Sequence, residues 1–133
     1  MILFIDTSKP ETKIALYCKA RFLAKKVWLS AKNQSEELLY EIDELFKKNN
    51  VDKSDIEKIL VVTGPGSYTG LRVGLSTANA LAMSLNIEID GIVSNHGQDV
   101  MLKKLVGNKA AFDKAVMPKY LNRPKITKPK PRR

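Results

Sequence analysis

The sequence is poor in the residues that form disulfides or bind metals. Among its 133 residues, Cys18 is the only cysteine and His96 the only histidine. A single cysteine excludes a disulfide within the chain and favours a reducing compartment. One histidine and one cysteine also fall short of a recognisable zinc ligand set, which takes three or four such side chains. We therefore expect no metal site.

Long apolar runs are missing as well. No stretch approaches the roughly 20 apolar residues of a membrane-spanning helix. The chain opens with MILFIDTS and not with a basic segment followed by a cleavage site. Hydrophobic residues make up 44% and charged residues 28% of the sequence, which is typical of a globular domain. We expect a cytoplasmic protein without membrane contact.

Positive charge is concentrated at one end of the chain. The net charge is +9, and residues 117–133 contain seven basic residues and no acid, which leaves 9 − 7 = +2 for residues 1–116. We predict one domain over 1–116 and a basic, proline-rich tail over 117–133. A solubilising tail is favoured, because Tyr120 is its only aromatic residue; the alternative is an arm that attracts RNA phosphates. The residues of that alternative are Arg123, Lys125, Lys128, Lys130, Arg132 and Arg133.

The hydrophobic pattern predicts an α/β fold. Three successive apolar runs predict antiparallel strands, after which the period changes to that of amphipathic helices alternating with buried strands. Together these elements predict a mixed five-stranded sheet with helices packed on it. The predicted strands are 2–6, 13–18, 21–29, 58–64 and 87–94; the predicted helices are 33–49, capped by Asn33 or Ser35, 70–86, capped by Thr69, and 95–106; SDIE at 54–57 predicts a capping box.

The stretch VVTGPGSYTGLRVG at 61–74 joins a predicted strand to a predicted helix. It lacks the lysine of a Walker loop, and its glycines follow GxGxxxG and not the GxGxxG of dinucleotide-binding proteins. A nucleophile elbow would need GxSxG. Two interpretations remain equally supported: backbone N–H groups that bind an anion at the helix N-terminus, or glycines that only permit a sharp turn.

Small residues form a stripe along the helix that follows. Gly70, Gly74, Ala78 and Ala82 are spaced four apart and share one face. Each glycine inside a helix costs about 1 kcal/mol relative to alanine, so a close neighbour must offset the cost. That neighbour is either another part of the same domain or a helix of another chain.

Three segments resemble the TsaB family of tRNA threonylcarbamoyladenosine biosynthesis. ILFIDTS resembles the family's opening ILAIDTS, and NQSEELLYEIDELF resembles its first helix. VVTGPGSYTGLRVGLSTANALAMSLNIEIDGI resembles its signature GPGSFTGLRIGLATAKGLA. The resemblance implies the actin, Hsp70 and sugar-kinase-like fold, with an RNase-H-like core. Members normally have two such domains, and VMPKYLNRP resembles the closing pattern of the second. We therefore expect a shortened member in which residues 95–116 replace that domain.

The resemblance also implies partners. The family member is not the catalyst but binds TsaD, the threonylcarbamoyl transferase, and forms homodimers when alone. A TsaE-type ATPase is a further expected partner, and tRNA is contacted indirectly or through the tail. The shared interface uses the first two helices, here 33–49 and 70–86. The expected interface residues are Tyr40, Gly70, Leu71, Gly74, Leu75, Ala78, Asn79, Ala82 and Met83.

Two alternatives to this scaffold role stay open. One is a small nucleotide- or phosphate-binding protein, and the other is a tRNA-binding accessory module that uses the tail. The fold's phosphate-binding turns usually contain glycine, which DTSKPETK lacks, so we expect that no cofactor is required. ATP with magnesium would be the ligand of the nucleotide alternative. The paired histidines of TsaD are absent too. The residues of the nucleotide alternative are Asp6, Thr7, Ser8, Gly64, Gly66, Ser67 and Thr69.

Overall fold

The structure is a computed structural model that describes residues 1–30 and 33–93. The expected helix over 95–106, the domain boundary at residue 116 and the tail over 117–133 lie outside the described residues. The described elements, in chain order, are β1 (Ile2–Asp6), β2 (Glu11–Cys18), β3 (Arg21–Leu29), α1 (Gln34–Lys48), a 3-10 turn η1 (Lys53–Asp55), β4 (Lys58–Gly64), α2 (Tyr68–Leu85) and β5 (Glu88–Val93).

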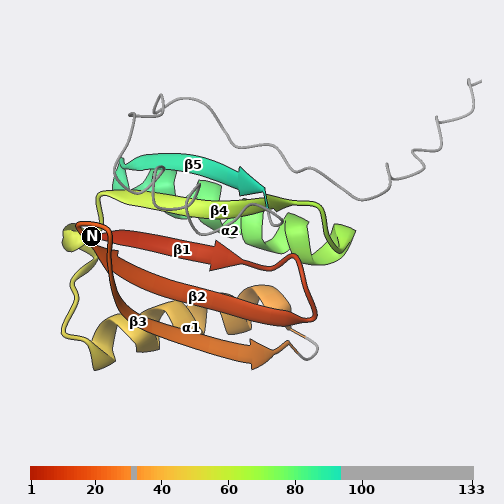
Figure 1. The fold of residues 1–133 in the computed structure, drawn as a ribbon, viewed down its shortest axis with the longest axis horizontal. Coiled ribbons are helices and arrows are strands. Elements are labelled where there is room, and N and C mark those ends of the chain that lie inside the picture. Colours follow the sequence, from red (N-terminus) through yellow and green to blue (C-terminus); the bar gives the residue numbers. More distant parts are fainter. Residues whose placement is uncertain (31–32, 94–133) are drawn as a thin grey trace, which may run out of the picture.

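The five strands form one mixed sheet in the order β3-β2-β1-β4-β5 (Figure 1). β1, β2 and β3 pair antiparallel, whereas β4 is parallel to β1 and β5 is parallel to β4. Parallel neighbours require a crossover, and the chain passes through α1 before β4 and through α2 before β5. The predicted α/β fold with three antiparallel N-terminal strands is confirmed.

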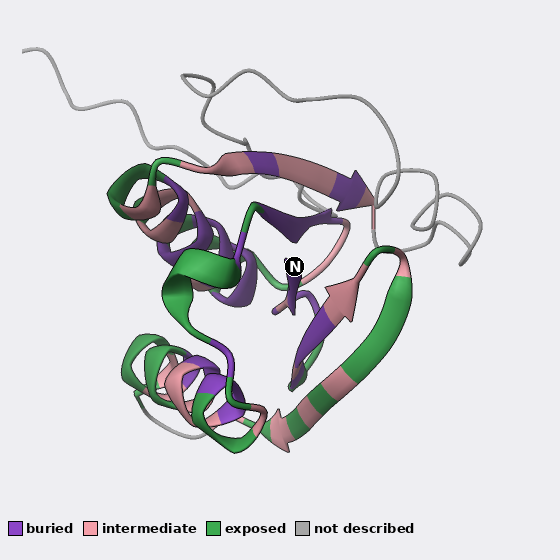
Figure 2. Ribbon diagram, turned by 90° about the vertical axis from the view of Figure 1, so that its left-hand side faces the viewer, coloured by how far each residue is buried: buried purple, intermediate pink, exposed green. Residues whose placement is uncertain are grey.

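Both helices cover the same face of the sheet (Figure 2). Successive side chains of a strand point to opposite faces. In β1, Leu3 and Ile5 therefore join the core beneath α1 and α2, whereas Ile2 and Phe4 belong to a second cluster on the opposite face. The main core includes fully buried side chains such as Leu16. Burial of one such side chain contributes about 1.5–3 kcal/mol.

The N-terminus of α2 differs from the prediction. The helix begins at Tyr68 with Ser67 as its N-cap, so Thr69 lies in its first turn. Ser67 has the extended backbone typical of an N-cap, and its hydroxyl accepts a hydrogen bond from the N–H of Gly70 at 3.4 Å. α1 begins after Asn33, one of the two caps expected, but the Asn33 side chain makes no capping hydrogen bond.

The capping box also lies elsewhere than predicted. Asp52 and Asp55 form it around η1, and not Ser54 and Glu57. The backbone N–H of Asp52 donates to the Asp55 carboxylate at 2.9 Å. The reason is that the turn begins two residues earlier, since Ile56 turns into the core and takes an extended backbone before β4.

Among the residues that the structure describes, no helix combines the length and the apolar character needed to cross a lipid bilayer. Within the same residues, no group of three His, Cys, Asp or Glu side chains is arranged to hold a metal ion.

Candidate protein-interaction surface

The first two turns of α2 lie directly against the residues that follow β1. A Cβ atom added at Gly70 would collide with the Thr7 carbonyl oxygen, and one at Gly74 would collide with the Thr7 hydroxyl. Gly66 is equally close to Ser8, whose Cβ would lie 2.7 Å from an added Cβ. The neighbour that offsets the cost of the helical glycines is thus part of the same domain.

Six of the nine expected interface residues therefore need correction. Gly70 and Gly74 face Thr7, and the other four face the core of the same domain, where Leu71 and Ala78 are completely buried. Because these residues lie on the buried side of α2, none of them is accessible to a partner. The six are Gly70, Leu71, Gly74, Leu75, Ala78 and Ala82.

The other three lie on the outer surface of the helices. Tyr40 is 61% exposed and Met83 is 83% exposed. Asn79 is half-buried, and its amide donates to the Leu75 carbonyl at 2.9 Å. Their exposure is compatible with the predicted interface.

The prediction missed two exposed apolar residues, Leu39 and Tyr68. Leu39 follows Leu38 directly, and it is 49% exposed whereas Leu38 is completely buried, so Leu39 lies at the edge of the buried face of α1. Tyr68 opens α2, and the Arg72 guanidinium lies over its ring at 5.5 Å from the centroid. Arg72 also donates to the Tyr68 hydroxyl at 3.3 Å. The pattern of leucines could have revealed Leu39, whereas the Tyr68 position depended on where the helix begins.

A continuous groove separates the exposed faces of the two helices, and we call it the α1–α2 groove. It consists of two surface hollows of about 330 and 390 Å³ and a third of about 350 Å³ that reaches into the core, where the buried Leu3 and Ile59 line it. Ser76 and Thr77 line both the first and the second hollow, and Leu39 and Leu81 line both the second and the third. The first hollow lies at the starts of the helices and the third at their ends, so the helices run side by side in the same direction.

The helix α1 beside the groove carries an excess of acidic residues. α1 contains five acidic residues and two lysines. Lys47 pairs with Asp43 at 2.9 Å, and the hydrogen bond with that carboxylate raises the pKa of Lys47. Lys26 of β3 approaches Glu41 at 3.8 Å. Two lysines against five acids give α1 a net charge of 2 − 5 = −3.

Six of the seven residues of the nucleotide alternative meet where β1 and β4 end and α2 begins. Here Ser67 donates from its backbone N–H to the Ser8 carbonyl at 3.1 Å. One Asp6 carboxylate oxygen accepts from the Ser8 N–H at 2.9 Å and from the Ser8 hydroxyl at 2.6 Å. Ser8 thus occupies the space beside Gly66 that a phosphate would need. These contacts favour a sharp connection over an anion site.

The remaining residues of that alternative fit the same interpretation. Thr7 is fully buried against Gly74, and its hydroxyl has no hydrogen-bond partner within the described part of the chain. Gly64 has a φ of 124°, which favours glycine, and ends β4. Thr69 lines the first hollow of the groove, away from Asp6. The six basic residues of the RNA alternative, from Arg123 to Arg133, lie outside the described residues.

Comparison with solved structures identifies the fold. Residues of this chain superpose on YeaZ from Pseudomonas aeruginosa with a TM-score of 0.64 and 25% identity, over 69% of this chain and 43% of that one. RuvC of Thermus thermophilus, solved with a Holliday junction, superposes with a TM-score of 0.52 at 11% identity, over 88% of this chain and 82% of that one. The latter likeness shows the fold alone. The chain has an actin-like, RNase-H-like α/β fold.

Sequence comparison then gives the family. The sequence profile of TsaD, tRNA N6-adenosine threonylcarbamoyltransferase, matches residues 28–115, which is more than half of the chain. The tRNA threonylcarbamoyladenosine biosynthesis protein TsaB of Bacillus subtilis is 35% identical over 117 residues, which is 88% of this chain and 48% of that protein. The chain belongs to the family of TsaD and TsaB proteins. It spans about half the length of the TsaB relative.

Proposed function

We propose that this chain is a non-catalytic subunit in the biosynthesis of tRNA threonylcarbamoyladenosine, and that it binds a TsaD-type subunit through the α1–α2 groove. The observation that carries the proposal is the groove itself, which runs the length of both helices and has exposed apolar side chains beside it. Leu39 and Tyr68 line the groove and are 49% and 41% exposed, and Tyr40 and Met83 are exposed elsewhere on the same helices. Apolar and aromatic side chains beside a concave surface are the usual anchors of a protein interface.

The non-catalytic role rests on the packed turn after β1. Ser8 donates two hydrogen bonds to the Asp6 carboxylate. Ser8 also fills the space beside Gly66, and Thr7 fills the space beside Gly70 and Gly74. A nucleotide that used this position would first have to displace these contacts. The nucleotide alternative therefore has less support than the interface.

The oligomeric state of the chain follows from the same surface. The groove would accept a second copy in the absence of TsaD, and we propose that homodimer and heterodimer compete for it. A TsaE-type ATPase is proposed as a further partner. We propose a cytoplasmic location, where tRNA is modified.

The test compares two leucine substitutions that add the same charge. Leu39 lines two hollows of the groove and is 49% exposed, whereas Leu29 is 72% exposed at the end of β3 and outside the groove. Leu39→Glu and Leu29→Glu are each mixed with TsaD of the same organism and measured by light scattering after size exclusion. We expect Leu39→Glu to weaken the complex at least tenfold, because it charges an apolar contact, and Leu29→Glu to bind normally.

Two outcomes would contradict the proposal. If neither the natural chain nor Leu29→Glu forms a complex with TsaD, the chain is not a TsaD-binding subunit. If Leu39→Glu binds as tightly as Leu29→Glu, a complex forms but not through the groove. Thermal unfolding of both variants shows whether any loss of binding is a loss of folding.

A further inference from the structure

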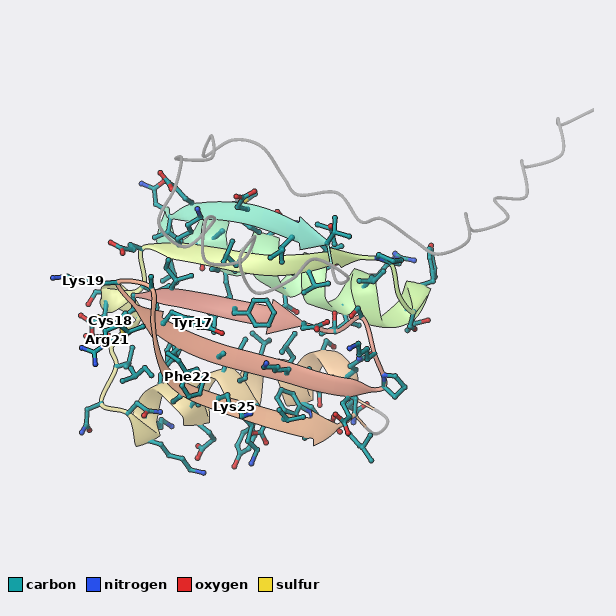
Figure 3. The ribbon with its side chains drawn as sticks, in the orientation of Figure 1. Tyr17, Cys18, Lys19, Arg21, Phe22 and Lys25 are labelled. Carbon is teal, nitrogen blue, oxygen red and sulfur yellow. The ribbon has the colours of Figure 1, made fainter. Side chains whose placement is uncertain are left out.

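The β2–β3 hairpin has an unusual charge distribution. Residues 12–35 contain six basic residues and no acid. Three of them, Lys19, Arg21 and Lys25, lie at or near the turn of the hairpin (Figure 3). All three are exposed, and none of them forms an ion pair with another described residue. The ion pair of Lys26 is made with Glu41, beneath the helices, so it does not neutralise this end of the hairpin.

An aromatic pair lies among these cations. The rings of Tyr17 and Phe22 meet edge to face, with centroids 6.0 Å apart and an interplanar angle of 72°. Tyr17 packs against the cluster of Ile2 and Phe4, and burial raises the pKa of its hydroxyl. Phe22 is 57% exposed. A half-buried tyrosine thus lies against an exposed phenylalanine ring.

The strand register brings Tyr17, Phe22 and Lys25 to one side of the sheet. Tyr17 is paired with Phe22 and Ala15 with Lys25. Ala15 belongs to the cluster on the face opposite the helices, and Tyr17 packs against the same cluster. Lys19 and Ala20 form the turn itself, with φ values of 49° and 65°. Figure 3 shows Lys19 and Arg21 at the turn end of the hairpin, and Arg21 is paired with Cys18, one position nearer the turn than the aromatic pair.

We propose that this surface binds an unpaired segment of RNA, and we call it the hairpin patch, formed by Tyr17, Lys19, Arg21, Phe22 and Lys25. Cations beside a fixed, exposed ring suit the two parts of a single-stranded nucleotide, since phosphates attract the cations and a base stacks on the ring. An acidic protein surface would use the cations but would not require the exposed ring. The identity of the RNA as tRNA rests on the proposed function.

The main test measures the salt dependence of RNA binding by the full chain, without TsaD. Fluorescence anisotropy follows an unmodified tRNA transcript over a series of salt concentrations. Arg21→Gln/Lys25→Gln removes two charges from the patch. Lys9→Gln/Lys48→Gln removes two exposed charges elsewhere and is the matched control. Each phosphate contact to a single strand contributes about 0.7 to the log–log slope, so we expect the patch variant to lower the slope by about 1.4. The control should leave it unchanged.

A second pair of variants tests stacking separately from charge. Phe22→Ala should weaken tRNA binding about tenfold, because a base loses its stacking platform, whereas Phe22→Trp should preserve binding. An RNA duplex of the same length should bind all three forms equally, since its bases are not available. Only the loss by Phe22→Ala together with rescue by Phe22→Trp indicates stacking, because a structural role would affect both RNAs.

Several results would overturn the inference. Equal salt slopes for the patch variant and its control would exclude the hairpin patch as the RNA contact. A lowered slope with full binding by Phe22→Ala would indicate a site for any polyanion, without base stacking. If the patch variants bind tRNA normally but lose TsaD, the surface contacts protein. None of these results affects the Leu39→Glu experiment. The proposals for the groove and for the hairpin patch can therefore be rejected independently.

Discussion

The helix side and the hairpin side of this small domain differ in both charge and shape. The helix side presents a groove with apolar side chains and the acidic residues of α1. The hairpin patch presents cations around an exposed phenylalanine and has no acidic residue of its own. One sheet supports both surfaces, because alternate residues of its strands point to opposite faces. The difference is what the two proposals require, since a protein contact at the groove and an RNA contact at the hairpin patch would use separate surfaces of one domain.

The comparison depends on the helix side being a rigid surface, and the largest expected effect tests this. Gly74→Glu should unfold the domain, because a charged side chain would have to occupy the space of Thr7 at the centre of the packing. The cost should match or exceed the roughly 5–15 kcal/mol stability of a typical domain. Ser76→Glu is the control, since Ser76 lies two residues away and is exposed. Circular dichroism and thermal unfolding measure both.

A folded Gly74→Glu variant would show that α2 does not pack on Thr7 as described. In that case the stripe of small residues would be accessible to a partner, and different residues of α2 would line the groove.

Two adjacent leucines provide the next contrast. Leu38→Ala should lower the free energy of unfolding by about 2–5 kcal/mol, because Leu38 is fully buried and its removal leaves a cavity. Leu39→Ala should change stability by no more than about 1 kcal/mol, since Leu39 is half-exposed, yet it should weaken TsaD binding. Urea unfolding and light scattering measure the two properties on the same samples. Equal losses of stability would place both leucines in the core.

The smallest expected effect lies in the hairpin. Ala20 has a φ of 65°, a left-handed conformation that costs roughly 1 kcal/mol for a residue with a Cβ. Ala20→Gly should therefore raise stability by about 0.5–1 kcal/mol, because glycine adopts this conformation without strain. It keeps every cation and ring of the hairpin patch, so tRNA binding should be unchanged. A loss of stability would mean that the turn has another conformation.

Periodicity alone predicted most of the fold, including the order of strands and helices. Leu38, Ile42 and Leu45 recur at helical spacing and do face the core. The partner of the glycine stripe could not be predicted in this way. Gly74 packs against Thr7, and a pattern along one helix carries no information about which distant residue approaches it. The stripe indicated a close contact correctly, but its assignment to another chain was wrong.

The cap of α2 was missed for a local reason. Ser67 and Thr69 are both good capping residues, and the sequence does not say where the backbone turns from extended to helical. The hairpin patch was missed for another reason. The absence of acids from residues 12–35 can be read in the sequence, but the irregular register that pairs Tyr17 with Phe22, and not with Leu23, cannot.

The contact between α2 and Thr7 has a consequence for how this protein can evolve. At positions 70 and 74 nothing larger than a hydrogen atom fits, so nearly every coding change there is selected against. Arg72, Ser76 and Ala80 lie on the outer side of the same helix and are exposed. Substitutions at these three positions leave the packing on Thr7 intact. Natural selection can therefore adjust the outer surface of α2 residue by residue, while the glycines keep the helix close to Thr7.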